Sequence, residues 1–278
     1  MSNLLKRAIT GAIYVLSVIA AIFIHPVVTG IYFLIVAMIG LWEFYNIAGK
    51  QDGVKPNKPV GFLLGAAVYM QCASFLLAFR FSRSAAILFP VIFPLLLLLL
   101  FVLVIGELYR KSEKPFTNIA YTLTGIIYVV VPLALTNVII YNHGTFSPMI
   151  LMSVFIFAWC NDTFAYLTGM KLGKHKLFER ISPKKTWEGW IGGFLFTIIA
   201  AIIVSHFSDV LSVIDFIVIA VITSVIGTFG DLVESMFKRQ AGVKDSGNIL
   251  PGHGGILDRF DILLLVLPAV MCYLFMVR

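Results

Sequence analysis

The stretch "VIDFIVIAVITSVIGTFGDLVESMFKR" (residues 213–239) contains the two features that decide how this chain folds. Its first part is apolar and as long as a helix that crosses the hydrocarbon core of a bilayer, which takes about 20 residues. Its end carries four polar side chains whose spacing places them on one helix face: Asp231, Glu234, Ser235 and Lys238. A helix end that emerges into water explains such a face. Asp231, however, still lies among apolar neighbours, so its charge needs a partner or a function.

The whole chain is unusually apolar. Of its 278 residues, 60% are hydrophobic and 13% are charged, against about 45–50% and about 25% in an average soluble domain. Apolar runs of spanning length lie at residues 4–24, 27–48, 60–78, 85–105, 118–139, 149–170, 190–207, 213–236 and 260–277. We therefore expect an all-α, polytopic integral membrane protein with about nine transmembrane helices, in which residues 1–278 form a single integral membrane domain.

The basic residues predict the orientation of these helices. With the N-terminus inside, 18 of the 21 Lys and Arg residues fall on the cytoplasmic side and 3 on the outer side, as the positive-inside rule requires. The C-terminus is then outside, and the long polar loops at about 171–189 and 237–259 face the cytoplasm. The formal net charge of +7 follows from this bias and from attraction to anionic headgroups, so we expect no nucleic acid partner.

The first polar loop, "KLGKHKLFERISPKKTWEG" (residues 171–189), contains six cationic side chains. Membrane topology and headgroup attraction alone explain many such loops. The segment "SPKKT" is more specific, because a proline fixes the backbone beside hydroxyl and ammonium donors that suit a phosphate. Its candidate phosphate-binding residues are Ser182, Lys184, Lys185 and Thr186.

A carboxylate also lies inside the sixth apolar run, where "WCNDTFAY" (residues 159–166) contains Asp162. A charged side chain within a span costs at least about 2.5–3.5 kcal/mol unless it finds a partner or water. Three explanations stay open for Asp162: a structural hydrogen bond between helices, a ligand or substrate contact, and an ion relay in a transporter.

The last polar segment, "KDSGNILPGHGGILDRFD" (residues 244–261), is rich in glycine and aspartate. The glycines of "PGHGG" (residues 251–255) permit φ > 0 and let backbone N–H groups approach a ligand closely. A lone His253 would more often be structural, but its glycine-rich setting beside a carboxylate pair favours a function. That pair, Asp258 and Asp261, shares a helix face because the two residues are three apart.

Carboxylates on these segments indicate a hard metal ion. Carboxylate oxygens select cations such as Mg²⁺, and with lysines, arginines and a flexible loop they form the kind of site that holds a nucleoside triphosphate. The three cysteines (Cys72, Cys160 and Cys272) lie in apolar runs and form no cysteine–histidine cluster for zinc. The sequence contains no Walker A motif and no Rossmann GxGxxG, so no standard soluble nucleotide fold is expected.

The run "SMFKRQAGVKDSGNILPGHGGILDRFD" (residues 235–261) closely resembles the signature of the phosphatidate cytidylyltransferases, also called CDP-diacylglycerol synthases. The segments "NDTFAY", "SPKKTWEG" and "GDLVES" also look like motifs of that family, in the family's order. The matching motifs are concentrated in residues 155–265, and the first half of the chain matches in hydrophobicity alone.

The resemblance implies an integral membrane enzyme that makes CDP-diacylglycerol from CTP and phosphatidic acid, with release of pyrophosphate, in phospholipid biosynthesis. It implies a divalent metal, usually Mg²⁺, with a second metal ion as an option. It also implies a homodimer that is in contact with membrane lipids. We expect a protein of the bacterial inner (plasma) membrane whose active site faces the cytoplasm, and a metal-assisted in-line displacement without a covalent intermediate.

The resemblance also implies metal-binding aspartates at Asp231 and Asp258, which Asp261 would support. The expected catalytic residues are Asp231, Asp258, Asp261, Lys244 and Arg259, the last of them for the lipid phosphate. The expected substrate-binding residues are Ser182, Lys184, Lys185, Thr186, Asp162, Lys238, Arg239, Gly252, His253, Gly254 and Gly255.

Two alternatives remain at this stage. Another CTP-using membrane enzyme, such as a polyprenol kinase or an archaeal-lipid cytidylyltransferase, would differ in the product it forms from labelled CTP. A transporter or channel is an alternative of a different class. Discontinuous helices paired between the two halves would favour a transporter, and the sequence contains no such pair.

Overall fold

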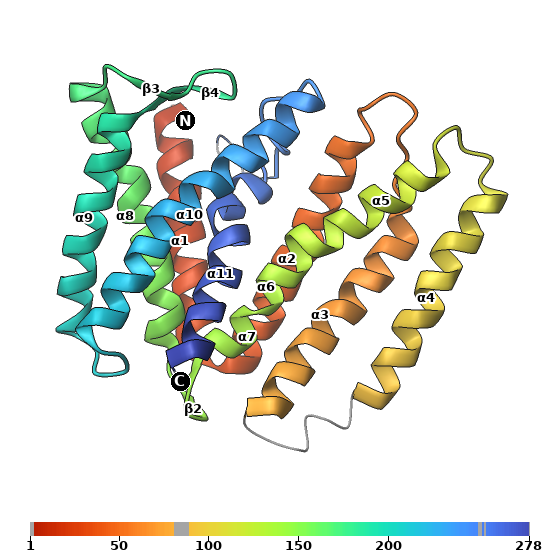
Figure 1. Cartoon of the computed structure of the whole chain (residues 1–278), viewed down its shortest axis with the longest axis horizontal. Coiled ribbons are helices and arrows are strands. Elements are labelled where there is room, and N and C mark those ends of the chain that lie inside the picture. Colours follow the sequence, from red (N-terminus) through yellow and green to blue (C-terminus); the bar gives the residue numbers. More distant parts are fainter. Residues whose placement is uncertain (1–2, 81–88, 250–251, 253, 278) are drawn as a thin grey trace. The chain divides into compact units, whose positions relative to one another are not determined.

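The computed structural model describes residues 3–80, 89–249, 252 and 254–277 (Figure 1), and these are predominantly helical. The long helices are α1 (Asn3–Ile24), α2 (Pro26–Ala48), α3 (Lys58–Arg80), α4 (Phe89–Tyr109), α8 (Pro148–Leu172), α9 (Trp187–Ser205), α10 (Val213–Gln240) and α11 (Leu257–Val277). Each lies on one of the apolar runs found in the sequence. The predicted start of the fourth run, at residues 85–88, lies outside the described residues.

Seven described segments are long and apolar enough to cross a membrane: Pro26–Ala48, Pro90–Tyr109, Pro115–Ile139, Pro148–Leu172, Trp187–Ser205, Val213–Gln240 and Leu257–Val277. The prediction of an all-α, polytopic membrane protein is therefore confirmed. Helices α1 and α3 form where spans are predicted, but they are not among these seven segments. The total of nine spans stays a prediction.

The fifth apolar run is helical but not regular. It consists of α5 (Pro115–Gly125), the π-helix η2 (Ile126–Val130), α6 (Val131–Ala134) and α7 (Thr136–Ile139). Pro132 explains the irregularity, because it has no N–H to donate to the carbonyl four residues earlier, and its ring would clash with that carbonyl in a regular α-helix. The span lies where it is predicted, and its α-helical pattern is interrupted by the π-helix and again at Leu135.

The described chain divides into two compact units. The first unit consists of Met1–Val138 and Gln240–Phe260, and the second of Ile139–Arg239 and Asp261–Arg278. Most of the glycine-rich segment therefore belongs to the first unit, whereas the segment "SPKKT" belongs to the second.

Buried polar side chains connect the helices of the first unit. Tyr45 of α2 is fully buried and donates a hydrogen bond to the carbonyl of Thr122 at 2.8 Å. Asn137 donates to the hydroxyl of Tyr69 at 2.9 Å, and that hydroxyl donates to the carbonyl of Gly30 at 2.8 Å. Because the bilayer core offers no water, buried polar groups of a membrane protein need such partners within the chain.

In the second unit, α8 and α9 pack closely because glycines line their contact. A Cβ atom on Gly189 would lie 2.7 Å from the carbonyl oxygen of Ala165, and one on Gly193 would lie 2.7 Å from that of Asn161. Thr168 also donates to the carbonyl of Gly189 at 3.2 Å. Small residues of this kind let transmembrane helices approach each other, and here they fix the two helices that flank the first polar loop.

Two short antiparallel hairpins accompany the helices of the second unit. β1 (Tyr141–Asn142) pairs with β2 (Thr145–Phe146), and β3 (Lys176–Phe178) pairs with β4 (Ser182–Thr186). The second hairpin connects α8 to α9 (Figure 1). The segment "SPKKT", expected as part of a loop, is therefore a β-strand.

Candidate active site

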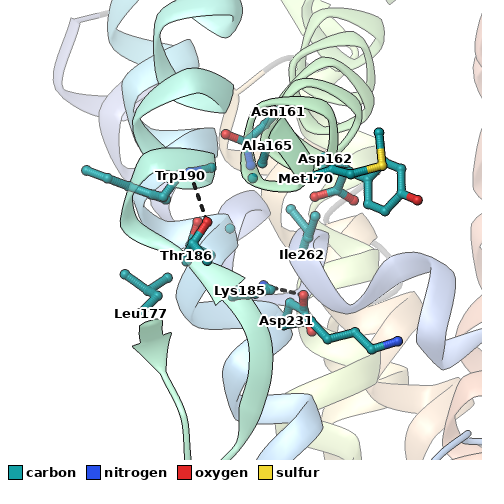
Figure 2. Close-up of a pocket in the computed structure, with 16 residues that line it drawn as sticks. Asn161, Asp162, Ala165, Met170, Leu177, Lys185, Thr186, Trp190, Asp231 and Ile262 are labelled. Carbon is teal, nitrogen blue, oxygen red and sulfur yellow. Dashed lines mark hydrogen bonds and ion pairs between the residues drawn. The ribbon is translucent and has the colours of Figure 1, made fainter. Parts of the chain in front are cut away.

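A cavity of about 400 Å³ lies in the second unit (Figure 2). Residues of α8, the β3–β4 hairpin, α9 and α10 line it, together with Ile262 of α11. Its charged side chains are Asp162, Lys184, Lys185 and Asp231, and its large apolar or aromatic side chains are Tyr166, Met170, Leu177, Trp190 and Ile262. The cavity therefore suits a ligand that has both a charged and an apolar part.

Lys185 and Asp231 form an ion pair in this cavity, as Figure 2 shows. Lys185 comes from β4 and Asp231 from α10, and their side chains are 28% and 27% exposed. Ser235, one turn further along α10, donates to Asp231 at 3.1 Å. These contacts supply the partner that a carboxylate among apolar residues requires.

Three carboxylates form a cluster at this place: Asp231, Glu234 and Asp261. One oxygen of each lies within 4.8 Å of the others. Glu234 is fully buried and forms an ion pair with Lys238, one turn further along α10. Asp162 is close enough to interact electrostatically with Asp261. We refer to Asp231, Glu234 and Asp261 as the carboxylate cluster.

The carboxylate cluster has the donor set of a site for a hard divalent cation. Oxygen ligands close enough to share one ion are what Mg²⁺ and similar cations require. Together with Asp162, the cluster brings four carboxylates against the two lysines that pair with it. A bound cation would lower the cost of this negative charge in a membrane protein. Within the described residues, no second group of three or more such ligands has this spacing.

The β3–β4 hairpin is attached firmly to the start of α9. Thr186 is buried and caps α9, because its hydroxyl accepts the N–H of Gly189 at 3.2 Å. Glu188 accepts the backbone N–H of Lys174 at 3.0 Å and pairs with the ring of His175 at 2.6 Å. The cap gives Thr186 a structural role in addition to its place in the cavity wall.

The other predicted residues of the second unit lie on the same elements. Lys184 is exposed on β4 and lines the cavity, while Ser182 is half-buried at the start of that strand. Lys238 is buried in its pair with Glu234, and Arg239 is exposed near the end of α10. The second unit thus brings together Asp162, Lys185, Asp231 and Asp261, which are far apart in the sequence.

The glycine-rich segment has the backbone geometry expected of it. Gly252 and Gly254 adopt φ values of +77° and +84°, which other residues rarely adopt. Gly255 is buried, and a Cβ atom there would collide with the hydroxyl of Ser246. His253 lies outside the described residues.

Asp258 closes this segment into a loop at the start of α11. Its Oδ2 accepts the backbone N–H groups of Ser246 at 2.9 Å and of Gly255 at 2.8 Å. Lys244 and Arg259 are exposed. Asp258 therefore shapes the loop of the first unit, and it is not a member of the carboxylate cluster.

Two buried carboxylates were missed as site residues from the sequence. Glu234 shares a helix face with Asp231, and this spacing was the available signal. Glu43 is fully buried in α2 and accepts hydrogen bonds from the glycine-rich segment. A charge within the apolar run 27–48 is the same kind of signal that draws attention to Asp162.

Comparisons with known proteins identify the family. The model of the cytidylyltransferase family matches residues 5–277. The chain is 33% identical to a phosphatidate cytidylyltransferase of Haemophilus influenzae over an alignment of 295 residues, which covers 98% of this chain and 99% of that protein. It is 42% identical to a phosphatidate cytidylyltransferase of Staphylococcus haemolyticus over 171 residues, 60% of this chain and 64% of that protein. The chain thus matches less than two thirds of the staphylococcal relative, but nearly all of the other one. Because the family match extends over almost its whole length, the chain is an enzyme of the cytidylyltransferase family.

Proposed function

We propose that this enzyme transfers the cytidylyl group of CTP to phosphatidic acid, giving CDP-diacylglycerol and pyrophosphate for phospholipid biosynthesis. The observation that carries the proposal is the cavity of the second unit, where the Lys185–Asp231 pair and an apolar wall occur together. A lipid phosphate needs cationic groups for its headgroup and an apolar surface for its chains. The name of the Haemophilus influenzae relative, which matches 98% of this chain, supports the same substrates.

The proposed reaction is one in-line displacement. A phosphate oxygen of phosphatidic acid forms a bond to the α-phosphorus of CTP, while the bond from that phosphorus to the oxygen bridging to the β-phosphorus breaks. Pyrophosphate leaves with the electron pair of the broken bond. The attacking oxygen is already anionic, so no strong base and no enzyme nucleophile are needed. The obstacle is repulsion between two polyanions, which positioned cations reduce.

The basic side chains supply this neutralisation. Lys184 and Lys185 line the cavity and are proposed to face the phosphates of the two substrates. The other proposed contacts to the triphosphate and the leaving pyrophosphate are Lys238, Arg239 and Lys244, and Arg259 is proposed for the lipid phosphate. The glycines of residues 251–255 would let backbone N–H groups close over the nucleotide.

A divalent cation, which we take to be Mg²⁺, would be held by the carboxylate cluster. When bound, it would stabilise negative charge on the phosphate oxygens. Lys185 pairs with Asp231 at the same place, so the lysine and a bound cation would compete for this carboxylate. Asp258 stays in the proposed ligand set because of its place in the signature, and its two backbone hydrogen bonds would keep its carboxylate fixed.

We also propose nine spans in a single integral domain, with the N-terminus inside and the C-terminus outside. The charge bias of 18 to 3 supports this orientation, which would make the active site accessible to cytosolic CTP. The bacterial relatives support a location in the bacterial inner membrane. A homodimer is proposed from the resemblance alone.

Purified protein in liposomes that contain phosphatidic acid tests the proposed function. With CTP and Mg²⁺, we expect CDP-diacylglycerol and pyrophosphate in equal amounts, and no product after addition of EDTA. Diacylglycerol or a polyprenol in place of phosphatidic acid should give no cytidylyl lipid. The proposal is wrong if the wild-type protein forms no CDP-diacylglycerol, or if a polyprenol is used as well as phosphatidic acid.

A further inference from the structure

Glu43 contacts both ends of the glycine-rich loop (residues 244–257, of which 250, 251 and 253 lie outside the described residues) within the first unit. Its fully buried carboxylate accepts three hydrogen bonds: from the hydroxyl of Ser246 at 2.9 Å, from the N–H of Ile256 at 3.0 Å and from the N–H of Leu257 at 2.8 Å. Ser246 lies at one end of the loop, and the other two donors lie where it enters α11. One side chain of α2 therefore sets the separation of the loop's ends.

The loop is built closely around this carboxylate. A Cβ atom on Gly247 would lie 2.5 Å from Oε1 of Glu43, and one on Gly255 would collide with both of its carboxylate oxygens. Real Cβ atoms essentially never make contacts this short, so a side chain at either position would displace the Glu43 carboxylate from its place against the loop. These two glycines serve the approach of the loop to Glu43, whatever they contribute to a ligand.

The chemistry of the donors requires a carboxylate at this position. The N–H groups of Ile256 and Leu257 open α11 and have no partner within the helix, and negative charge is stabilised at a helix N-terminus. A glutamine at position 43 would keep the shape of the side chain, but its amide nitrogen donates and cannot accept. One donor of the loop would then face another donor and lose its hydrogen bond.

We propose that Glu43 is a positioning residue for the transfer reaction: it holds the glycine-rich loop in the conformation that binds CTP, without touching the substrate. This inference rests on the proposed function, which assigns the loop to the nucleotide. Ser246 connects Glu43 to Asp258, because its hydroxyl donates to the first and its backbone N–H to the second. The two carboxylates thus hold Ser246 together, Glu43 through its hydroxyl and Asp258 through its backbone N–H.

If Glu43 had a purely structural role, its loss would affect the enzyme in the same way as the loss of any other buried carboxylate. Glu107 provides that comparison. Glu107 is also a buried carboxylate of the first unit, with 3% exposure. It accepts hydrogen bonds from Asn118 at 3.2 Å and from Ser112 at 3.1 Å and also forms an ion pair with Arg110, and these three partners lie outside the glycine-rich loop. Glu107→Gln therefore removes a buried charge, and an ion pair with it, away from the loop, which makes it a demanding control.

The test measures initial rates of CDP-diacylglycerol formation against CTP concentration for the wild type, Glu43→Gln and Glu107→Gln. Glu43→Gln should lower kcat/KM for CTP roughly tenfold to a hundredfold, mainly through KM, because a loop that is less often in its binding conformation weakens apparent affinity. The KM for phosphatidic acid should not change, and neither constant should change in Glu107→Gln. Hydrogen exchange of the loop amides, measured without CTP, should be faster in Glu43→Gln alone.

A wild-type KM for CTP in a folded Glu43→Gln protein would overturn this proposal, as would equal losses in the two glutamine variants. If Glu43→Gln does not fold, Ser246→Ala decides, because it removes one hydrogen bond and keeps the carboxylate. A raised KM for CTP in Ser246→Ala supports the positioning role, and an unchanged KM overturns it. If the wild type makes no CDP-diacylglycerol, the proposed function fails instead, and the exchange measurement then decides whether Glu43 holds the loop.

Discussion

Lys185→Met should weaken catalysis and, at the same time, tighten the binding of the metal ion. In the wild type, the ammonium group of Lys185 pairs with Asp231, so it competes with any cation in the carboxylate cluster. Methionine keeps most of the length and the apolar stem of lysine, and the substitution therefore removes chiefly the charge. We expect the Mg²⁺ concentration for the half-maximal rate to fall while kcat also falls.

The exposure of the Lys185–Asp231 pair sets the expected loss of stability in Lys185→Met. Breaking a buried ion pair costs about 3–5 kcal/mol, whereas an exposed pair contributes about 0–1 kcal/mol. The side chains of Lys185 and Asp231 are 28% and 27% exposed. We therefore expect the free energy of unfolding to fall by about 1–3 kcal/mol, between these limits. Loss of one positioned group that stabilises transition-state charge lowers kcat by about 10²–10³-fold, and we expect a loss of that order.

The assay follows pyrophosphate release at saturating CTP and phosphatidic acid over a range of Mg²⁺ concentrations. Lys176→Met is the control, because Lys176 is exposed on β3 of the same hairpin and is not among the cavity-lining residues. It removes the same charge from the same hairpin, and should leave both kcat and the Mg²⁺ dependence close to the wild type. Competition for Asp231 is refuted if the two variants behave alike, or if Lys185→Met needs more Mg²⁺ than the wild type.

Three further predictions concern the metal ligands, the topology and the stereochemistry. Asp231→Asn and Asp258→Asn should each remove most activity in a protein that still folds and inserts; near-wild-type turnover at limiting Mg²⁺ would exclude that residue as a primary ligand. In a cysteine-free variant, a cysteine in place of the exposed Asn248 should react with an impermeant thiol reagent only after cells are permeabilised. Labelling of intact cells would show that this loop is outside and would contradict the predicted topology. Transfer from CTP made chiral at the α-phosphorus by sulfur substitution should invert its configuration; retention would require an enzyme nucleophile and two displacements.

Hydropathy was sufficient to place the long helices, because a transmembrane helix needs a long run of apolar residues, and the segments between the helices contain none. The eight long helices lie on the predicted runs. The break at Ile126–Val130 does not follow from hydropathy, since the residues of a π-helix are as apolar as their neighbours. Pro132 was the one local sign of it.

The β3–β4 hairpin could not be predicted from its residues. Two-stranded hairpins are marginally stable alone, and this one depends on contacts with the start of α9. Glu188 binds the backbone at Lys174, and the N–H of Trp187 donates to the carbonyl of His175 at 3.0 Å. Such contacts leave no periodic pattern in the sequence.

The chemical types of the site residues were predictable, but their pairing was not. Asp231 stood out because charge in an apolar run needs a reason, and Lys185 because its segment, SPKKT, offers donors that suit a phosphate. Nothing local showed that they pair with each other, or that Glu43 binds Ser246, which lies 203 residues away. Pairings over such separations depend on how the helices pack, and one sequence does not record them.

The fate of two phosphorus atoms distinguishes cytidylyl transfer from its alternatives. Purified wild-type protein is given phosphatidic acid, Mg²⁺ and CTP that carries radioactive phosphorus at the α-position in one reaction and at the γ-position in another. We expect the α-label in the lipid extract as CDP-diacylglycerol, and the γ-label in the aqueous phase as pyrophosphate. A γ-label in the lipid would indicate a CTP-dependent kinase, and an α-label that stays entirely in the aqueous phase would equally contradict the proposed transfer.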